Sequence, residues 1–100
     1  MNMWKDVLEY FYLEQETENM SCFRLKDRYV DAINRNFRFL LISQTEQYVV
    51  YYSYSQQNSS LVVNKREFGD REEAELYIRS EINEIIRKNL IYFVFGKFVK

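Results

Sequence analysis

The sequence predicts an α+β fold: an N-terminal helical part, a three-stranded antiparallel meander, a long amphipathic helix over 70–88 and a C-terminal strand. Three observations support this prediction. Isoleucines recur at helical spacing late in the chain, runs rich in β-branched and aromatic residues fill its middle, and an apolar run closes it. One hundred residues with no proline and two glycines indicate a single domain over 1–100, without a linker.

The first segment, residues 2–13, is expected to be an amphipathic helix. Trp4, Val7, Leu8 and Phe11 recur at the i, i+3, i+4, i+7 spacing of one helix face. An acidic segment without a base follows, with glutamates at positions 14, 16 and 18. These glutamates are either a solvated helix end and loop or an acidic patch that docks on a basic partner surface.

Two patterns compete over residues 21–36. As a strand, Phe23 and Leu25 alternate with basic residues, whereas as a helix the apolar residues from Cys22 to Ile33 share one stripe. The helical pattern fits more residues, so we expect a helix over 22–34. The basic residues here either balance the acidic segment or contact nucleic acid. They are Arg24, Lys26, Arg28, Arg35 and Arg38.

The middle of the chain changes character and predicts three strands. The β-rich runs Phe37–Ser43, Tyr48–Ser55 and Leu61–Phe68 are separated by short polar connections of hairpin length. Both faces of the first two runs carry apolar or aromatic side chains. Such a sheet needs cover on both faces, or it leaves one face for a partner. The third run is more polar and suits an edge strand.

The helix over 70–88 is the clearest element of the chain. Asp70 is a suitable N-cap, and acidic residues crowd the first turn and basic residues the last, as the helix dipole favours. The apolar run Leu90–Phe95 follows and is typical of a strand that is central in a sheet or buried in an interface. A homodimer through Leu90–Phe98 is one way to bury its aromatic residues. The helix stripe consists of Ala74, Ile78, Ile82, Ile85 and Ile86.

The residue types argue against an enzyme and against bound cofactors or metals. There is no histidine, and a single cysteine, Cys22, makes neither a zinc site nor a Cys–His nucleophile pair. Two isolated glycines exclude a phosphate-binding or dinucleotide-binding loop. A net charge of −1 gives no electrostatic footprint for nucleic acid. The lone cysteine suits a cytoplasmic protein, and no signal peptide or membrane span is expected.

The tyrosine-rich stretch around 48–54 is the best candidate binding surface. Tyrosine combines a large rigid ring with a polar tip and is enriched at interface hot spots. The alternatives are that these rings pack under the helices or stack on nucleic-acid bases. The predicted protein-binding set consists of Glu14, Glu16, Glu18, Tyr48, Tyr51, Tyr52 and Tyr54.

In general character the chain resembles the small proteins of low-GC bacteria and their phages, which include anti-CRISPR and other anti-defence inhibitors. The resemblance is one of composition: Asn, Tyr, Ile, Glu and Lys are abundant, and Pro and Gly are scarce. It implies a non-enzymatic, stoichiometric inhibitor that occludes the functional surface of a protein partner. The alternatives are a toxin-neutralising immunity protein and a nucleic-acid-binding accessory protein that uses the basic segment 24–38.

Overall fold

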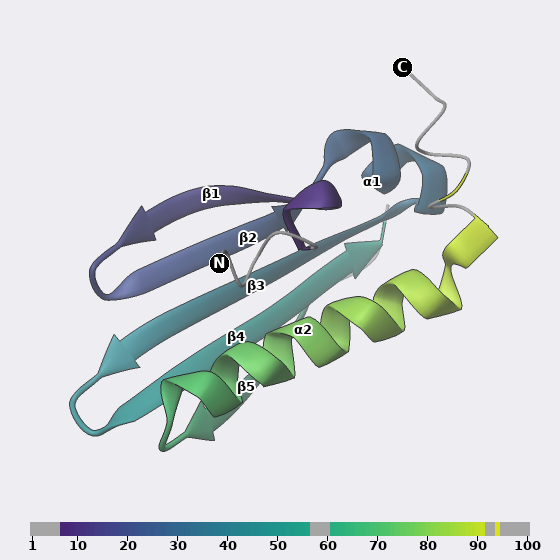
Figure 1. The fold of residues 1–100 in the computed structure, drawn as a ribbon. Coiled ribbons are helices and arrows are strands. Elements are labelled where there is room, and N and C mark those ends of the chain that lie inside the picture. Colours follow the sequence, from purple (N-terminus) through teal and green to yellow (C-terminus); the bar gives the residue numbers. More distant parts are fainter. Residues whose placement is uncertain (1–6, 57–60, 92–93, 95–100) are drawn as a thin grey trace.

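The computed structural model describes residues 7–56, 61–91 and 94. These residues form a five-stranded antiparallel sheet in the order β1-β2-β3-β4-β5, and helix α2 crosses one face of it (Figure 1). Each strand therefore pairs with its neighbours in the sequence. The elements are η1 (Val7–Glu9), β1 (Phe11–Thr17), β2 (Met20–Leu25), α1 (Asp27–Ile33), β3 (Arg35–Gln44), β4 (Gln47–Gln56), β5 (Val62–Phe68) and α2 (Arg71–Lys88).

The prediction of an N-terminal helical part is wrong. A single 3-10 turn leads into β1, which forms a hairpin with β2. The register of this hairpin shifts between Leu13 and Gln15, so a bulge at Glu14 breaks the alternation that would have indicated a strand. Tertiary packing decides the conformation, because Phe11 is fully buried in the core. Residues 2–6 of the predicted helix lie outside the described residues.

Both patterns seen in the sequence over 21–36 occur, one after the other. Strand β2 buries Phe23 and Leu25, and the chain becomes helical only at Asp27. The predicted helix over 22–34 is therefore wrong in its first part and right in its second. Helix α1 ends at Ile33 and is capped by Asn34, which has a left-handed φ of 58° and donates its backbone N–H to the carbonyl of Val30 at 2.8 Å.

The three predicted strands lie where expected, but they are part of a larger sheet than the predicted meander. The predicted runs correspond to β3, β4 and β5. Strand β3 also pairs with β2, and in this pairing Phe23 stands opposite Phe39. Strand β5 is an edge strand, and its residues from 62 to 67 are exposed. Lys65 and Arg66 lie on this edge, where charged side chains oppose pairing with another chain.

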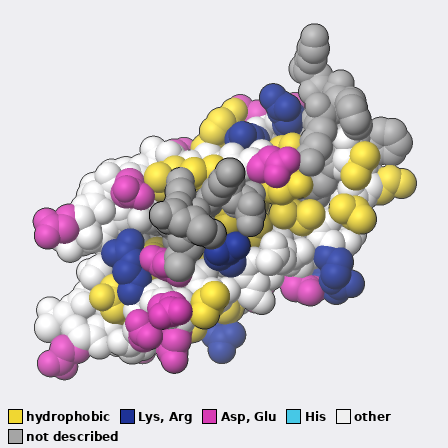
Figure 2. Space-filling view, viewed as in Figure 1, with side chains coloured by type: hydrophobic (Ala, Val, Ile, Leu, Met, Phe, Trp, Pro, Cys, Tyr) yellow, Lys and Arg dark blue, Asp and Glu magenta, His cyan; other side chains and the backbone are white. Residues whose placement is uncertain are grey.

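Helix α2 lies where the sequence predicts it. Asp70 caps it, accepting a hydrogen bond from the backbone N–H of Glu72 at 3.0 Å. In Figure 2, acidic side chains gather at the start of α2 and basic side chains near its end. The predicted stripe faces the sheet: Ala74, Ile78, Ile82 and Ile85 are buried and Ile86 is partly buried. On the outer side Leu76 is 54% exposed.

The prediction of a C-terminal strand is also wrong. Leu90, Ile91 and Val94 have helical conformation after α2, and their side chains are exposed. The rest of the proposed dimer segment Leu90–Phe98 lies outside the described residues. A six-residue apolar run has no period of its own that separates strand from helix. No helix in the described parts of the chain is both long enough and apolar enough to cross a membrane.

The core lies between α2 and the face of the sheet that α2 covers. Aromatic rings from three strands meet there: the ring centroid of Phe39 lies 5.9 Å from that of Phe11 and 4.7 Å from that of Tyr52. Helix α1 contributes Tyr29, which is buried against the same cluster. All described helices therefore contribute to one side of the sheet.

Candidate functional site

The other face of the sheet is covered by no described helix, and we call it the open face. Strand residues alternate between the two faces of a sheet. Phe39 is buried on the covered face, so Arg38 and Leu40, the residues on either side of it, belong to the open face. The same rule assigns Tyr51 to the open face and Tyr52 to the covered one. A sheet with one covered face normally carries polar side chains on the other.

The centre of the open face is instead apolar. Two neighbouring rows across β2, β3 and β4 carry apolar side chains in register, and we call these six residues the apolar patch. Five of them are partly exposed, whereas Val49 is only 1% exposed. An apolar cluster on a sheet face without a described helix over it is typical of an interaction surface. The apolar patch consists of Met20, Ile42 and Val49 in one row and Cys22, Leu40 and Tyr51 in the next.

A network of paired charges borders the apolar patch on the β1 side. Arg24 and Arg38 stand opposite each other in register, which alone would be repulsive. The carboxylate of Glu14 lies 3.4 Å from Arg24 and 3.6 Å from Arg38, so it offsets both charges. Arg24 also donates a hydrogen bond to Asp27 at 2.7 Å, which raises the pKa of the guanidinium. The bulge in β1 places Glu14 where it reaches both arginines.

Tyr12 extends this border toward the edge of the sheet. It is 43% exposed, and its ring lies 5.1 Å from the guanidinium carbon of Arg24 and 5.7 Å from the ammonium of Lys26. These distances suit cation–π contacts, each worth about 0.5–1 kcal/mol at an exposed site. On the opposite side of the patch, Lys65 and Glu67 of β5 form an ion pair at 3.3 Å. Paired charges therefore border the apolar patch on both sides.

Cys22 contributes the thiol of the apolar patch. Burial raises the pKa of its thiol, and the neighbouring carboxylate of Glu14 raises it further. The thiol also contacts Glu14 Oε2 at 3.7 Å. A raised pKa keeps the sulfur protonated at neutral pH, so Cys22 is a small apolar group of the patch and not an activated nucleophile.

An unpaired polar atom lies at the far end of the open face. The side-chain oxygen of Asn36 is buried and accepts no hydrogen bond from the described residues. It borders a hollow of about 180 Å³ that Arg38, Ser53 and Ser55 also line. A buried acceptor without a donor costs about 1–3 kcal/mol, and a donor from a bound molecule would recover part of that.

The predicted protein-binding residues do not form one surface. Glu14 and Tyr51 lie on the open face, and Glu16 and Glu18 are exposed at the end of the first hairpin. The other three tyrosines of the set, Tyr48, Tyr52 and Tyr54, belong to the covered face.

The predicted nucleic-acid set is divided as well. Arg24, Lys26 and Arg38 border the open face. Arg28 is exposed on α1, and Arg35 lines a pocket on the covered face. The sequence did indicate that both faces of β3 and β4 are apolar, but it did not identify Met20 as their neighbour, because β2 was expected to be helical.

Comparison with models of protein families, with curated proteins and with solved structures finds no match. The chemistry of the open face is therefore the basis for a functional proposal. Within the described ranges, cysteine and carboxylate side chains form no group of three that could hold a metal ion.

Proposed function

We propose that this protein is a non-catalytic binding protein whose open face docks on a folded protein partner. The observation that supports the proposal is an apolar patch that no described helix covers, with charged pairs on two sides of it. Specific protein interfaces have this arrangement, with a desolvated apolar centre inside a polar rim. Tyr51 lies within the patch, and tyrosine is one of the residue types enriched among hot spots.

The size of the open face suits a specific interface. Five strands spaced about 4.8 Å apart and up to ten residues long, at about 3.4 Å per residue, give an area on the order of 500–700 Å². A standard interface buries about 800 Å² on each partner. The first figure is the area of a flat sheet, and side chains that protrude from it and residues at the strand ends add further accessible area.

The rim charges favour a protein partner over nucleic acid. Phosphate binding requires cations that are free to replace counterions. Arg24 contacts two carboxylates, Arg38 contacts one of them, and Lys65 contacts Glu67. We infer a partner surface that is apolar at its centre and near neutral at its edge, so that affinity depends weakly on salt.

The mode of action we propose is stoichiometric occlusion in the cytoplasm, as in inhibitors of the phage or mobile-element, anti-defence type. A sheet presents its side chains on a backbone fixed by hydrogen bonds, so little conformational entropy is lost on binding. The ordered side chains of the apolar patch would then act by covering a surface of the partner. The compositional resemblance to small phage and bacterial proteins supports this mode.

The experiment that tests the proposal starts from tagged protein in bacterial lysate, with and without nuclease treatment. A captured protein is identified, purified and titrated against the wild type and against Leu40→Lys and Tyr51→Lys on the open face. Leu76→Lys on the outer side of α2 is the matched control, because it places the same charge at an exposed leucine. Circular dichroism and urea unfolding establish that each variant is folded.

We expect 1:1 binding that loses at least about tenfold in affinity in each open-face variant, since truncation of a hot-spot residue costs about 2 kcal/mol or more. The Leu76→Lys control is expected to bind as the wild type does. Equal affinity of folded Leu40→Lys and Tyr51→Lys for the partner would refute the open face as the binding surface. Loss of every partner on nuclease treatment would refute the choice of protein over nucleic acid.

A further inference from the structure

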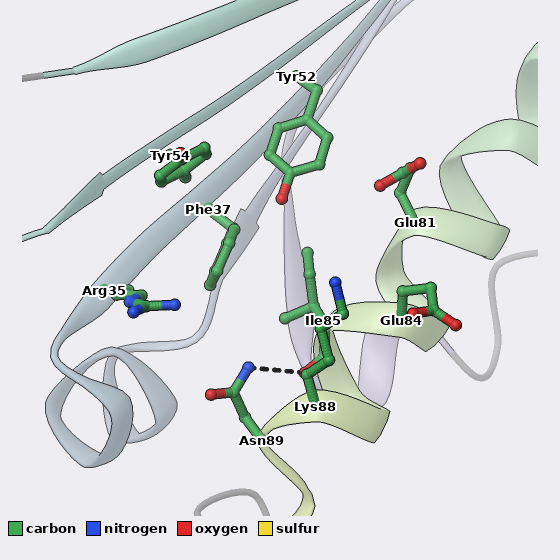
Figure 3. Close-up of a pocket in the computed structure, with 9 residues that line it drawn as sticks. All are labelled: Arg35, Phe37, Tyr52, Tyr54, Glu81, Glu84, Ile85, Lys88 and Asn89. Atoms are coloured by element: carbon green, nitrogen blue, oxygen red, sulfur yellow. Dashed lines mark hydrogen bonds between the residues drawn. The ribbon is translucent and has the colours of Figure 1, made fainter.

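A pocket of about 430 Å³ lies on the covered face, between the last turns of α2 and strands β3 and β4 (Figure 3). Its volume is within the range of small-molecule sites, about 300–1,000 Å³. It is on the opposite side of the sheet from the apolar patch, so its function is independent of the function proposed above.

One wall of the pocket is aromatic. Phe37 lies 6.3 Å from Tyr52 in an edge-to-face arrangement and 6.1 Å from Tyr54, measured between ring centroids. Ile85 of α2 also lines the pocket. Figure 3 shows the Tyr52 side chain reaching from β4 toward Ile85, with its hydroxyl at the tip. A flat apolar molecule in this pocket would contact the edges of the aromatic rings and the aliphatic side chain of Ile85.

The charged groups of the pocket are incompletely paired. Glu84 is held by Arg87 at 2.8 and 3.2 Å, so its charge is already offset. Among the described residues, Arg35 and Lys88 form no ion pair within 4.0 Å, and neither does Glu81. The pocket therefore has two positive charges without an ion-pair partner among the described residues, on Arg35 and Lys88, and one such negative charge, on Glu81.

The polar groups of the pocket add hydrogen-bond donors. Burial, together with the nearby carboxylate of Glu81, raises the pKa of Tyr52 to about 12. Its hydroxyl is thus protonated at neutral pH and able to donate. The side-chain amide of Asn89 donates to the carbonyl of Ile85 at 2.8 Å, which fixes its position at the pocket edge (Figure 3).

We propose that this pocket binds a small organic anion, a carboxylate or a phosphate monoester on a flat apolar body. Arg35 and Lys88 bind the anionic group, since guanidinium and ammonium groups are the usual partners of carboxylate and phosphate. The body of the ligand packs on Phe37 and Ile85. Glu81 lies on the other side of the pocket from Arg35 in Figure 3 and disfavours a ligand whose apolar body carries an additional anionic group.

Titration with four matched probes, followed by amide chemical shifts in NMR spectra, tests this proposal. Phenyl phosphate and benzoate are the anions, benzyl alcohol is the neutral analogue and benzylamine is the cation. We expect saturable shifts around Phe37 and Ile85 with a Kd on the order of 1 mM for at least one anion, a realistic affinity for a small fragment. The stronger of the two anions shows whether carboxylate or phosphate is preferred.

Charge-neutralising variants identify the cations involved. Arg35→Gln and Lys88→Gln should each weaken anion binding by about tenfold, the equivalent of one charged hydrogen bond. Arg28→Gln is the control, because it removes the same charge from an exposed position on α1 that does not line the pocket.

Three results would overturn the proposal. The first is the absence of saturable shifts with either anion. The second is benzylamine or benzyl alcohol binding as tightly as the anions, since the charge would then contribute nothing. The third is an equal loss of affinity in Arg28→Gln and Arg35→Gln, which would indicate a general effect of net charge.

Discussion

Tyr51 and Tyr52 follow one another in β4, yet their side chains lie on opposite faces of the sheet. Tyr51 stands opposite Leu40 within the apolar patch of the open face. Tyr52 stands opposite Phe39 and packs on it with 4.7 Å between ring centroids. One tyrosine-rich stretch thus contributes to two separate surfaces, the proposed protein interface and the wall of the pocket.

Truncation of these two tyrosines should therefore have unequal effects on folding. Tyr52→Ala removes a ring from the core and should lower the free energy of unfolding by about 3 kcal/mol, as for other large aromatic truncations. Tyr51→Ala removes a ring that packs under no described helix and should cost about 1 kcal/mol or less. Urea unfolding of both variants measures the difference. Equal losses would contradict the assignment of the two faces.

The stability of the protein should fall at alkaline pH through Tyr52. Its pKa in the folded protein is about 12, above the ordinary value of 10.0. The folded state therefore favours the protonated hydroxyl, and the stabilisation is present below pH 10 and is lost as the pH rises toward 12. Tyr52→Phe should reduce this alkaline loss when the free energy of unfolding is measured against pH. Burial also raises the pKa of Tyr77 and of Cys22, so part of the loss should remain.

Glu14 should stabilise the pair of facing arginines. Glu14→Gln leaves Arg24 and Arg38 opposed and should lower the free energy of unfolding by roughly 0.5–1 kcal/mol, the range for partly exposed ion pairs. Glu16→Gln, at an exposed position two residues away, should change it by less than about 0.5 kcal/mol. A loss in the control as large as in Glu14→Gln would show that general charge, and not this network, is responsible.

The same substitution should make Cys22 more reactive. Burial is the main cause of its raised pKa, and the charge of Glu14 adds to it. Glu14→Gln removes only the second contribution, so the thiolate fraction at a fixed pH should increase and alkylation should be faster. The rate of reaction with iodoacetamide across alkaline pH gives the apparent pKa in each variant. An unchanged pKa would mean that Glu14 does not act on the thiol.

The cap of α2 should contribute about 1 kcal/mol. Asp70→Ala removes the acceptor of the Glu72 N–H bond and should lower the free energy of unfolding by this amount, whereas Asp70→Asn should retain most of it. Thermal and urea unfolding of the two variants provide the comparison. A loss in Asp70→Asn equal to that in Asp70→Ala would show that charge alone, without a side-chain hydrogen bond, stabilises the helix start.

The elements that the sequence predicted correctly have strong local signals. Helix α2 has a cap, a dipole-matched charge order and a stripe of isoleucines. The hairpin formed by β1 and β2 lacks such signals: its turn contains no glycine, and its bulge at Glu14 interrupts the alternation. Here the burial of Phe11 and Phe23 in the assembled sheet stabilises the strands more than the local helical pattern stabilises a helix.

The two candidate sites differ in how far the sequence could indicate them. Apolar residues on both faces of β3 and β4 suggested an uncovered surface, and Tyr51 was among the predicted contacts. The pairing of Glu14 with Arg24 and Arg38 depends on β2 lying between β1 and β3, which the predicted helix did not allow. The pocket depends on where the end of α2 lies over the sheet, and no periodicity encodes that position.

The most direct test of the open face is site-specific photo-crosslinking to the partner. A photoreactive residue is placed at position 40, in the apolar patch, or at position 76, on the outer side of α2, and each protein is irradiated with its purified partner. We expect a covalent complex from position 40 and none from position 76. Cross-linking from position 76 alone, with both proteins folded and bound, would show that the partner binds the helix side and that the open face is not the interface.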